Sequence, residues 1–330
     1  MKAIIKKILN FLASYILVSK KFKARKGEVV ILMYHGVINS QPDIPDWCLV
    51  QKENFEKQIK FLSQHFNIIS LLDAYSGLKN ATIEGPTAVI TFDDGYQNNH
   101  DIAWPILEKY KAPATVFIST NLIDSNSSIW TARLQDAFGK TNRQEISWRN
   151  RSYNLSSKIA KSNSLNEIKR DLKKEHVSII ESEANKLIKE LNHQNNTTLS
   201  IDSPYRMMTR EMISDMNQSE LIDFGAHTEN HPILSQLSPD EQSKEILNSV
   251  KKTSEITLEP CQTFAYPNGQ KTDYSKDTIE ILQKQDLKLS LTTEMGINTQ
   301  KTPQFELLRY GVGNEANFQQ ELLSMYTRYK

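Results

Sequence analysis

The sequence has few cysteines and no excess of charge of one sign. Cys48 and Cys261 are its only two cysteines among 330 residues, too few for a disulfide framework or a zinc ribbon. The two thiols could pair in an oxidising compartment, but we favour two unpaired structural thiols. With 40 basic and 39 acidic residues the net charge is +1. No overall field attracts a polyanion, so we expect no nucleic-acid partner.

The N-terminal segment, residues 1–27, has no apolar run long enough to span a bilayer comfortably. Its apolar stretch, Ile8–Val18, is short, whereas a spanning helix needs about 20 residues. Lysines in front of this stretch resemble the start of a signal peptide, but more basic residues follow in place of a small-residue cleavage site. A basic amphipathic segment that contacts an anionic membrane surface through residues 1–26 fits equally well. We favour a cytoplasmic or membrane-associated location, with export as the alternative.

After Gly27, short apolar runs alternate with stretches of helical periodicity. Eight runs are predicted strands: Val29–Tyr34, Phe66–Ser70, Ala88–Phe92, Ala114–Ile118, Ile222–Ala226, Thr263–Pro267, Lys288–Thr293 and Leu307–Val312. Apolar spacing predicts helices over residues 51–65 and 99–111, and Ser238-Pro239-Asp240-Glu241 has the pattern of a capped helix start. Buried strands that alternate with helices indicate an α/β fold with a parallel sheet, and their number favours a barrel, whose chemistry lies at the C-terminal ends of the strands.

Residues 126–200 interrupt this alternation and lack strand signals. A long, otherwise charged helix is predicted there from the apolar stripe Leu165, Ile168, Leu172, Ile179, Ile180, Ala184, Leu187 and Leu191. We interpret residues 126–200 as a mainly helical insertion that packs beside the cleft. The barrel then comprises residues 28–125 and 201–330.

Polar residues follow several of the predicted strands. These residues are His35, the pair Asp93 and Asp94, the pair His227 and His231, Asn268, and Arg309. If the runs form a barrel, these side chains converge on one mouth.

The two histidines are spaced by one helical turn, so both imidazoles can face one metal ion. Alone, His227 and His231 are equally well explained as surface or turn residues. Two histidines and one carboxylate, however, leave positions open for water and substrate, as in a catalytic rather than a structural zinc site. Of two adjacent aspartates at a strand end, one can bind the metal and the other can take a proton from water, although Asp-Asp-Gly alone is also a turn signal.

The motifs together carry a family resemblance. Thr91–Gly95 reads TFDDG and His227–His231 reads HTENH, with Leu32–Val37 and Phe264–Gly269 as two further signatures in the same order. Over about residues 28–125 and 205–315 the chain resembles the NodB-homology polysaccharide deacetylases. The resemblance implies a distorted (β/α) barrel and a divalent metal, most often zinc. It also implies hydrolysis of N-acetyl or O-acetyl groups on an acetylated polysaccharide or glycan precursor; we expect N-acetyl.

Matched position by position, the resemblance implies the roles of individual residues. Asp94, His227 and His231 become the metal ligands and Asp93 the general base. Substrate contacts fall to the third signature, Tyr266, Pro267 and Asn268, with a backbone N–H near Asn268 for the oxyanion.

Two departures from the family pattern affect the catalytic assignments. No arginine precedes Pro267, and Leu307-Leu308-Arg309 stands where the family often has Leu-x-His. Because arginine stays protonated it is a poor acid, so we expect Arg309 to orient Asp93 and His35 to act as the acid. His35 is equally well explained as a structural histidine.

These departures leave alternatives open. One is a catalytically lapsed carbohydrate-binding relative of the same fold, and another is a different metal hydrolase such as a phosphoesterase, which would need more carboxylates or a second metal. The sequence does not specify the oligomeric state.

Overall fold

The computed structural model describes residues 26–192, 198–314 and 317–328. The predicted membrane contact of residues 1–26 lies outside these ranges except for Lys26. Within them, no helix combines the length and the apolarity that crossing a membrane requires.

The centre of the molecule is a parallel sheet whose strands all fall within the predicted runs or begin one residue earlier. Their order is β11 (Leu289–Leu291), β10 (Thr263–Ala265), β9 (Ile222–Ala226), β6 (Ala114–Ile118), β5 (Thr87–Phe92), β1 (Val29–Tyr34) and β12 (Tyr310–Gly311), while β4 (Asn67–Ile68) pairs with the first residues of β5. The prediction of parallel strands is confirmed.

The segment around β12 joins the two edges of the sheet. Leu307 pairs with Leu291 of β11 in a parallel bridge, and three residues later Tyr310 and Gly311 pair with Leu32 and Met33 of β1. The sheet is therefore closed into a barrel by one short, irregular strand, which gives the expected distorted barrel.

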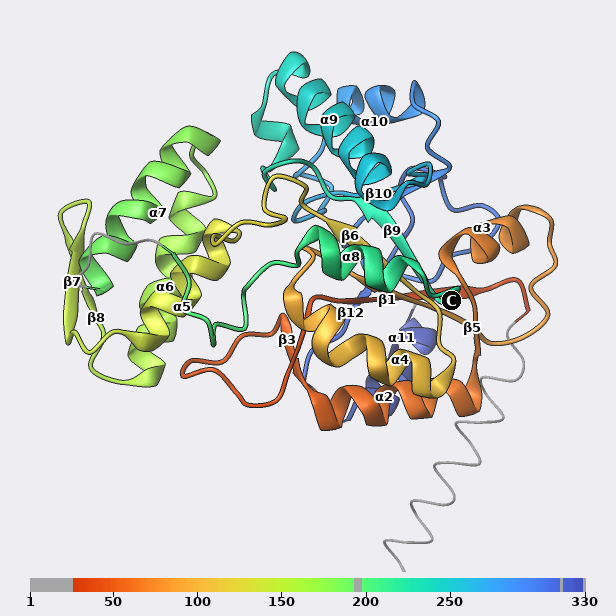
Figure 1. Cartoon of the computed structure of the whole chain (residues 1–330), viewed down its shortest axis with the longest axis horizontal. Helices are drawn as coiled ribbons and strands as arrows, with labels where there is room; N and C mark the ends of the chain where they lie inside the picture. The colour runs from red at the N-terminus through yellow and green to blue at the C-terminus, as the bar shows by residue number, and fades with distance from the viewer. Residues whose placement is uncertain (1–25, 193–197, 315–316, 329–330) are drawn as a thin grey trace, which may run out of the picture.

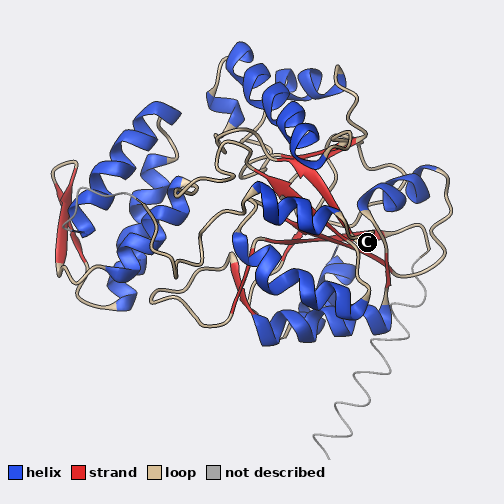
Figure 2. Cartoon of the chain, in the orientation of Figure 1, coloured by secondary structure: helices blue, strands red, loops and turns tan. Residues whose placement is uncertain are grey.

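Helices pack around the barrel (Figures 1 and 2). Around the barrel these are α2 (Lys52–His65), α3 (Leu71–Lys79), a π-helical turn (Asn99–Ala103) that continues into α4 (Trp104–Tyr110), α8 (Arg210–Asn217), α9 (Pro239–Thr257), α10 (Lys276–Gln283) and α11 (Phe318–Arg328). The predicted start of α9 is confirmed, because Ser238 and Glu241 form a capping box. A short parallel pair, β2 (Gly36–Ile38) and β3 (Leu49–Gln51), was not predicted.

Alternation along β1 separates two apolar clusters. Val30 and Leu32 pack with the residues of the covering helices. Val29 and Ile31 pack with Val89, Phe117 and strand residues from β10 and β11 inside the barrel. Because side chains alternate, every second residue of a strand points into the interior.

The described residues of the segment 126–200 form a lobe on one side of the barrel (Figure 1), in which two expectations are wrong. The lobe contains α5 (Trp130–Lys140), a hairpin of β7 (Glu145–Trp148) and β8 (Arg151–Asn154), α6 (Lys158–Leu172) and α7 (Val177–Asn192). It therefore has strands, and the predicted long helix is two helices. Exposed Ile179 does not belong to its core.

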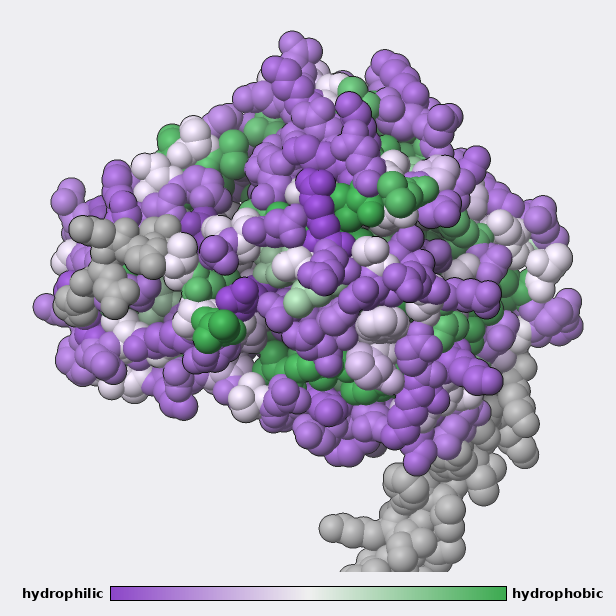
Figure 3. Space-filling view, in the orientation of Figure 1, coloured by the Kyte–Doolittle hydropathy of each residue, from purple (hydrophilic) through white to green (hydrophobic). Residues whose placement is uncertain are grey.

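The lobe shares its core with the barrel. Ile168 and Leu191 of the lobe belong to the same buried cluster as Ile38, Leu49 and Tyr205 of the barrel. The face shown in Figure 3 is mostly hydrophilic, and its hydrophobic residues form separate patches. Both cysteines are free, which confirms the unpaired interpretation.

Candidate active site

Asp93 follows β5 and points into the barrel. Val89, Thr91 and Asp93 are alternate residues, so Asp93 inherits the inward direction of Val89. Its backbone N–H donates to the Tyr34 carbonyl over 2.9 Å, which continues the pairing of β5 with β1. Asp93 is only 2% exposed, so its buried carboxylate requires a partner that forms hydrogen bonds or carries the opposite charge.

That partner is Arg309, which is fully buried. Its Nη1 and Nη2 each lie 2.7 Å from a different oxygen of Asp93. Arg309 Nε donates to the Thr292 carbonyl over 2.7 Å, and its guanidinium carbon lies 6.0 Å from the centre of the Phe117 ring. Such a two-pronged pair fixes the direction of the Asp93 carboxylate.

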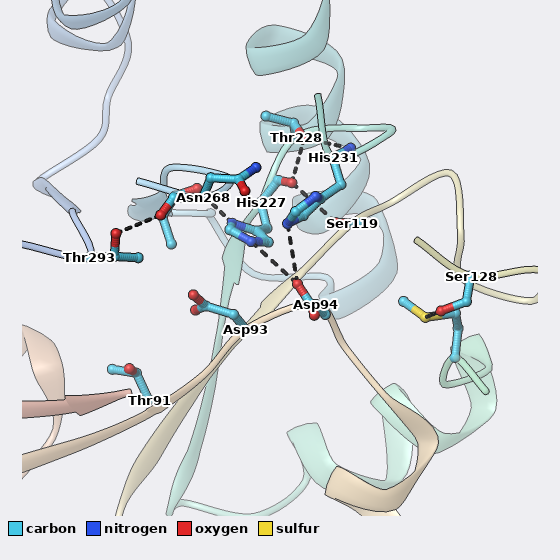
Figure 4. Close-up of polar contacts among 12 residues, drawn as sticks. Thr91, Asp93, Asp94, Ser119, Ser128, His227, Thr228, His231, Asn268 and Thr293 are labelled. Atoms are coloured by element: carbon cyan, nitrogen blue, oxygen red, sulfur yellow. Dashed lines mark hydrogen bonds and ion pairs between the residues drawn. The ribbon is translucent and has the colours of Figure 1, made fainter. Parts of the chain in front are cut away.

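Asp94 would point out of the barrel if the strand continued. Its φ is +77° and that of Gly95 is +87°, a left-handed conformation that is uncommon for a residue other than glycine. This bend turns the Asp94 carboxylate back toward the mouth (Figure 4). A Cβ on Gly95 would meet Ile118 Cγ2 at 3.1 Å, so glycine is favoured by both space and φ.

His227 and His231 reach the mouth from the loop after β9. Their Nε2 atoms lie 3.6 Å and 3.4 Å from Asp94 Oδ1. The loop is not helical, so the helical-turn explanation for the spacing is wrong. Instead, Thr228 and His231 have φ of 65° and 58°, and Thr228 Oγ1 accepts the His231 backbone N–H over 3.0 Å.

Thr228 and the Ala265 carbonyl are the parts of this site that the sequence prediction overlooked. Thr228 is fully buried, and its position inside the HTENH motif was the available signal. The Ala265 carbonyl lies 2.7 Å from His227 Nδ1, and nothing in the sequence of β10 indicates that contact.

The donor set fits a divalent cation. Because a carbonyl only accepts, His227 Nδ1 must donate to Ala265, which leaves the Nε2 lone pair of the neutral ring facing Asp94 Oδ1, another acceptor. That oxygen is buried without a hydrogen-bond partner. The three ligand atoms lie within 4.8 Å of one another. A cation between them would satisfy all three, and two imidazoles with one carboxylate suit zinc or a similar ion.

The charges of the site act on one another. Burial alone would raise the pKa of Asp93, but Arg309 and His227 outweigh it and lower that pKa below its usual value. In their protonated forms, His227 and His231 hold the pKa of Asp94 well below its usual range, again against burial. Burial would lower the pKa of His227, yet Asp93 and Asp94 raise it, whereas burial prevails for the pKa of His231.

His35 lies near enough to the same carboxylates for an imidazolium there to lower the pKa of both Asp93 and Asp94. Its Nδ1 is buried without a hydrogen-bond partner among the described residues. The structural alternative, in which a ring nitrogen bonds a loop carbonyl, therefore finds no such bond at Nδ1. The His35 ring contacts the Trp47 indole edge to face, with centroids 5.1 Å apart.

The third signature divides between the mouth and the core. Tyr266 is fully buried, its hydroxyl donates to the Phe305 carbonyl over 2.8 Å, and its ring stacks on Tyr274. Pro267 is buried as well. The Tyr266 side chain thus has no surface to offer a substrate, unlike the sequence expectation.

Asn268 is only partly buried and lies at the mouth (Figure 4). Its backbone has φ of 58°, and its carbonyl accepts the Thr293 hydroxyl over 2.5 Å. Lys173, at the end of α6 in the lobe, donates to Asn268 Oδ1 over 2.6 Å. The next backbone N–H, that of Gly269, is already bonded to the Pro267 carbonyl.

Comparison with known proteins gives these features a family. The family model described as polysaccharide deacetylase matches residues 80–199 and 186–290, which together cover more than half of the chain. The chain belongs to the polysaccharide deacetylase family.

Relatives in this family are similar over different shares of the chain. The poly-beta-1,6-N-acetyl-D-glucosamine N-deacetylase of Staphylococcus epidermidis is 30% identical over 122 residues, 33% of this chain and 42% of that protein. The matched region thus spans less than half of that relative's length. The putative polysaccharide deacetylase YxkH of Bacillus subtilis is 21% identical over 291 residues, 87% of this chain and 72% of that protein.

Solved structures confirm the fold. The Streptococcus pyogenes deacetylase PplD, solved in complex with acetate, superposes with a TM-score of 0.61 at 20% identity and covers 91% of this chain and 99% of its own. IcaB from Ammonifex degensii gives 0.56 at 18% identity, over 91% and 97% of the two chains. The expected deacetylase-type barrel is therefore confirmed.

Proposed function

We propose that this protein is a zinc-dependent hydrolase that removes acetyl groups, N-acetyl in particular, from a polysaccharide or glycan precursor. The observation that carries the proposal is the pairing of two carboxylates at one strand end. Asp94 lies against two imidazoles, and Asp93, one residue away, lies against a buried guanidinium. Family membership and the names of the relatives support the same reaction.

Asp94, His227 and His231 would hold the ion. A divalent ion bound there polarises an acyl carbonyl and makes a neighbouring water more acidic. The protein supplies the geometry, because the Ala265 carbonyl orients His227 and the left-handed bend orients Asp94.

Asp93 is the general base of the proposed reaction. Arg309 lowers the pKa of Asp93 and, with His227, keeps it ionised despite burial. The ionised Asp93 can therefore take the proton of the attacking water. Arg309 itself stays charged and orients the base, as the sequence predicted for a chain that lacks the arginine before Pro267.

His35 and Asn268 complete the proposed machinery. His35, beside both carboxylates, is the group that can return a proton to the leaving amine. Because Lys173 can only donate, the atom of Asn268 that faces it is the amide oxygen, and the amide N–H₂ remains available for the acetyl oxygen.

Metal content and acetate release test the proposal together. Purified protein should hold about one equivalent of zinc, and Asp94→Ala or His227→Ala should lose it. His176→Ala is the matched control, since His176 lies in the lobe and bonds Ser178 there. Full metal content in Asp94→Ala and His227→Ala would show that these residues are not metal ligands.

The second measurement isolates the base. Acetate release from N-acetylglucosamine oligomers should fall at least about a hundredfold in Asp93→Asn while zinc stays bound. Wild-type protein that binds zinc and oligomers but releases no acetate would instead identify a lapsed carbohydrate-binding relative.

A further inference from the structure

Trp47 stands out among the surface residues of the molecule. Trp47 is 59% exposed. It is the one aromatic residue among the exposed large hydrophobic residues in the described ranges. An exposed indole loses contact with the core without gaining a polar partner, so such a residue commonly marks a binding surface.

The turn that carries Trp47 is held on both sides. Asp46 accepts the Cys48 backbone N–H at 3.1 Å and the Tyr205 hydroxyl at 2.8 Å, and Tyr205 is buried. The Cys48 carbonyl accepts the Gly36 N–H over 3.0 Å, which ties the turn to β2. The indole is therefore exposed on a braced loop, and a ligand would pay little to order it.

The indole lies at the mouth of the barrel. One contact is the His35 ring, at 5.1 Å between centroids and 80° between planes. Another is the backbone of β12, since a Cβ on Gly311 would lie 3.6 Å from Trp47 Cζ3. Trp47 thus bridges the ends of β1 and β12, the two strands that precede His35 and follow Arg309.

The chemistry of the site suggests what covers the indole. A pyranose ring carries its hydroxyls at the edge and C–H groups on its faces, and the face of an aromatic ring is electron-rich, so the two faces attract. The proposed reaction brings a glycan to His35, next to which Trp47 presents its exposed surface.

We propose that Trp47 forms a sugar-stacking subsite, which holds the pyranose ring next to the acetylated sugar under attack. The inference rests on the proposed function and adds the residue that binds the neighbouring sugar of the chain. Trp47 binds substrate; it takes no part in proton transfer.

A length series of N-acetylglucosamine oligomers, from monomer to pentamer, tests the subsite on the full-length zinc-loaded protein. In Trp47→Ala the ratio of kcat/KM for the tetramer to that for the monomer should fall about fivefold to tenfold, mainly through KM. Trp47→Phe, which keeps an aromatic face, should recover most of the ratio. Leu258→Ala, an 86% exposed residue that precedes β10 at the other end of the barrel, is the control.

Direct binding separates this inference from the proposed function. The tetramer should change the tryptophan fluorescence of wild type, and Trp47→Phe should lose that change while it still binds the tetramer by calorimetry. Binding that depends on Trp47 without acetate release would support the subsite and refute the deacetylase.

Other results would overturn the subsite alone. Acetate release with the same tetramer-to-monomer ratio in wild type and Trp47→Ala would do so. An equal loss for monomer and tetramer would also do so, because it would mean that Trp47 only packs against His35.

Discussion

Charged side chains are held differently at the barrel mouth and in the lobe of residues 126–200. At the mouth, the side chains of Arg309 and Asp93 are 0% and 3% exposed and lie 2.7 Å apart. In the lobe, Arg151 reaches Glu167 at 3.4 Å with 64% of its side chain exposed. Water screens the second pair, whereas each member of the first depends on the other to remain charged in the interior. The same residue types thus form a buried pair in one case and a solvated pair in the other.

The two regions also differ in what holds them. The strands of the barrel are buried on both faces, between an inner and an outer cluster. The lobe has one core, which it completes with barrel residues such as Ile38 and Tyr205. The packing of the lobe therefore depends on the barrel. We expect a destabilising substitution in the barrel to loosen the lobe more than a substitution in the lobe loosens the barrel.

Arg309→Met should have the largest effect, because it removes the buried pair at the mouth. It leaves Asp93 buried without its cation, so we expect a loss of about 3–5 kcal/mol in the free energy of unfolding together with the loss of acetate release. Urea denaturation measures the first. The matched control Arg151→Met should cost less than about 1 kcal/mol. Similar small losses in both variants would contradict the difference between the two regions.

The same variant predicts a pH dependence. Asp93 has a lowered pKa in the folded protein, so its stabilisation is present above the ordinary aspartate pKa of about 3.9 and is lost as the pH falls through the folded pKa. In Arg309→Met the largest effect that opposes burial is gone, so the pKa of Asp93 rises. The stability gap between wild type and variant should therefore narrow as the pH falls, and a constant gap would argue against this account.

Ile168→Ala tests whether the lobe can loosen by itself. Ile168 is fully buried in α6, and removing its side chain should cost about 2–5 kcal/mol. We expect faster amide hydrogen exchange in α5, α6 and α7 with zinc content unchanged. Ile90→Ala, at an equally buried position of β5, is the control and should speed exchange in both regions. Loss of bound metal in Ile168→Ala would show that the lobe also holds the proposed metal ligands in place.

Lys173→Met should have the smallest effect and probes the contact between the regions. It removes the donor to Asn268 Oδ1, so the amide is free to turn. We expect kcat/KM to fall about threefold to tenfold, the effect of losing one solvent-exposed hydrogen bond, with thermal stability unchanged. Lys174→Met, which removes only a pair with Asp171 inside the lobe, is the control. Equal activity in the two variants would remove Lys173 from the positioning of Asn268.

The barrel and the lobe also differ in how well the sequence predicts their structure. Strands buried on both faces are continuous apolar runs, so all eight were found, although β4 and β12 are only two residues long. The β7–β8 hairpin was missed because its outward residues are polar and its two-residue turn is Arg149-Asn150, at φ of 49° and 61°, rather than Asn-Gly. The alternation of Ile146 and Trp148 was the signal available.

The division of α6 from α7 could not be predicted for a related reason. The apolar stripe continues through the break at residues 173–176, where no glycine or proline stands. The helix ends because the chain turns to pack α7 against α5, a tertiary contact rather than a local preference.

The sequence by itself determined that carboxylates and imidazoles follow buried strands, because strand order and alternation are written in the apolar pattern. It also indicated that Asp93 and Arg309 belong together. Only the tertiary structure decided how they meet: left-handed bends at Asp94 and Thr228 aim the ligands, and the chain between β11 and β12 carries Arg309 into the interior. The result joins residues as far apart in the chain as Asp93 and Arg309, which local propensity does not encode.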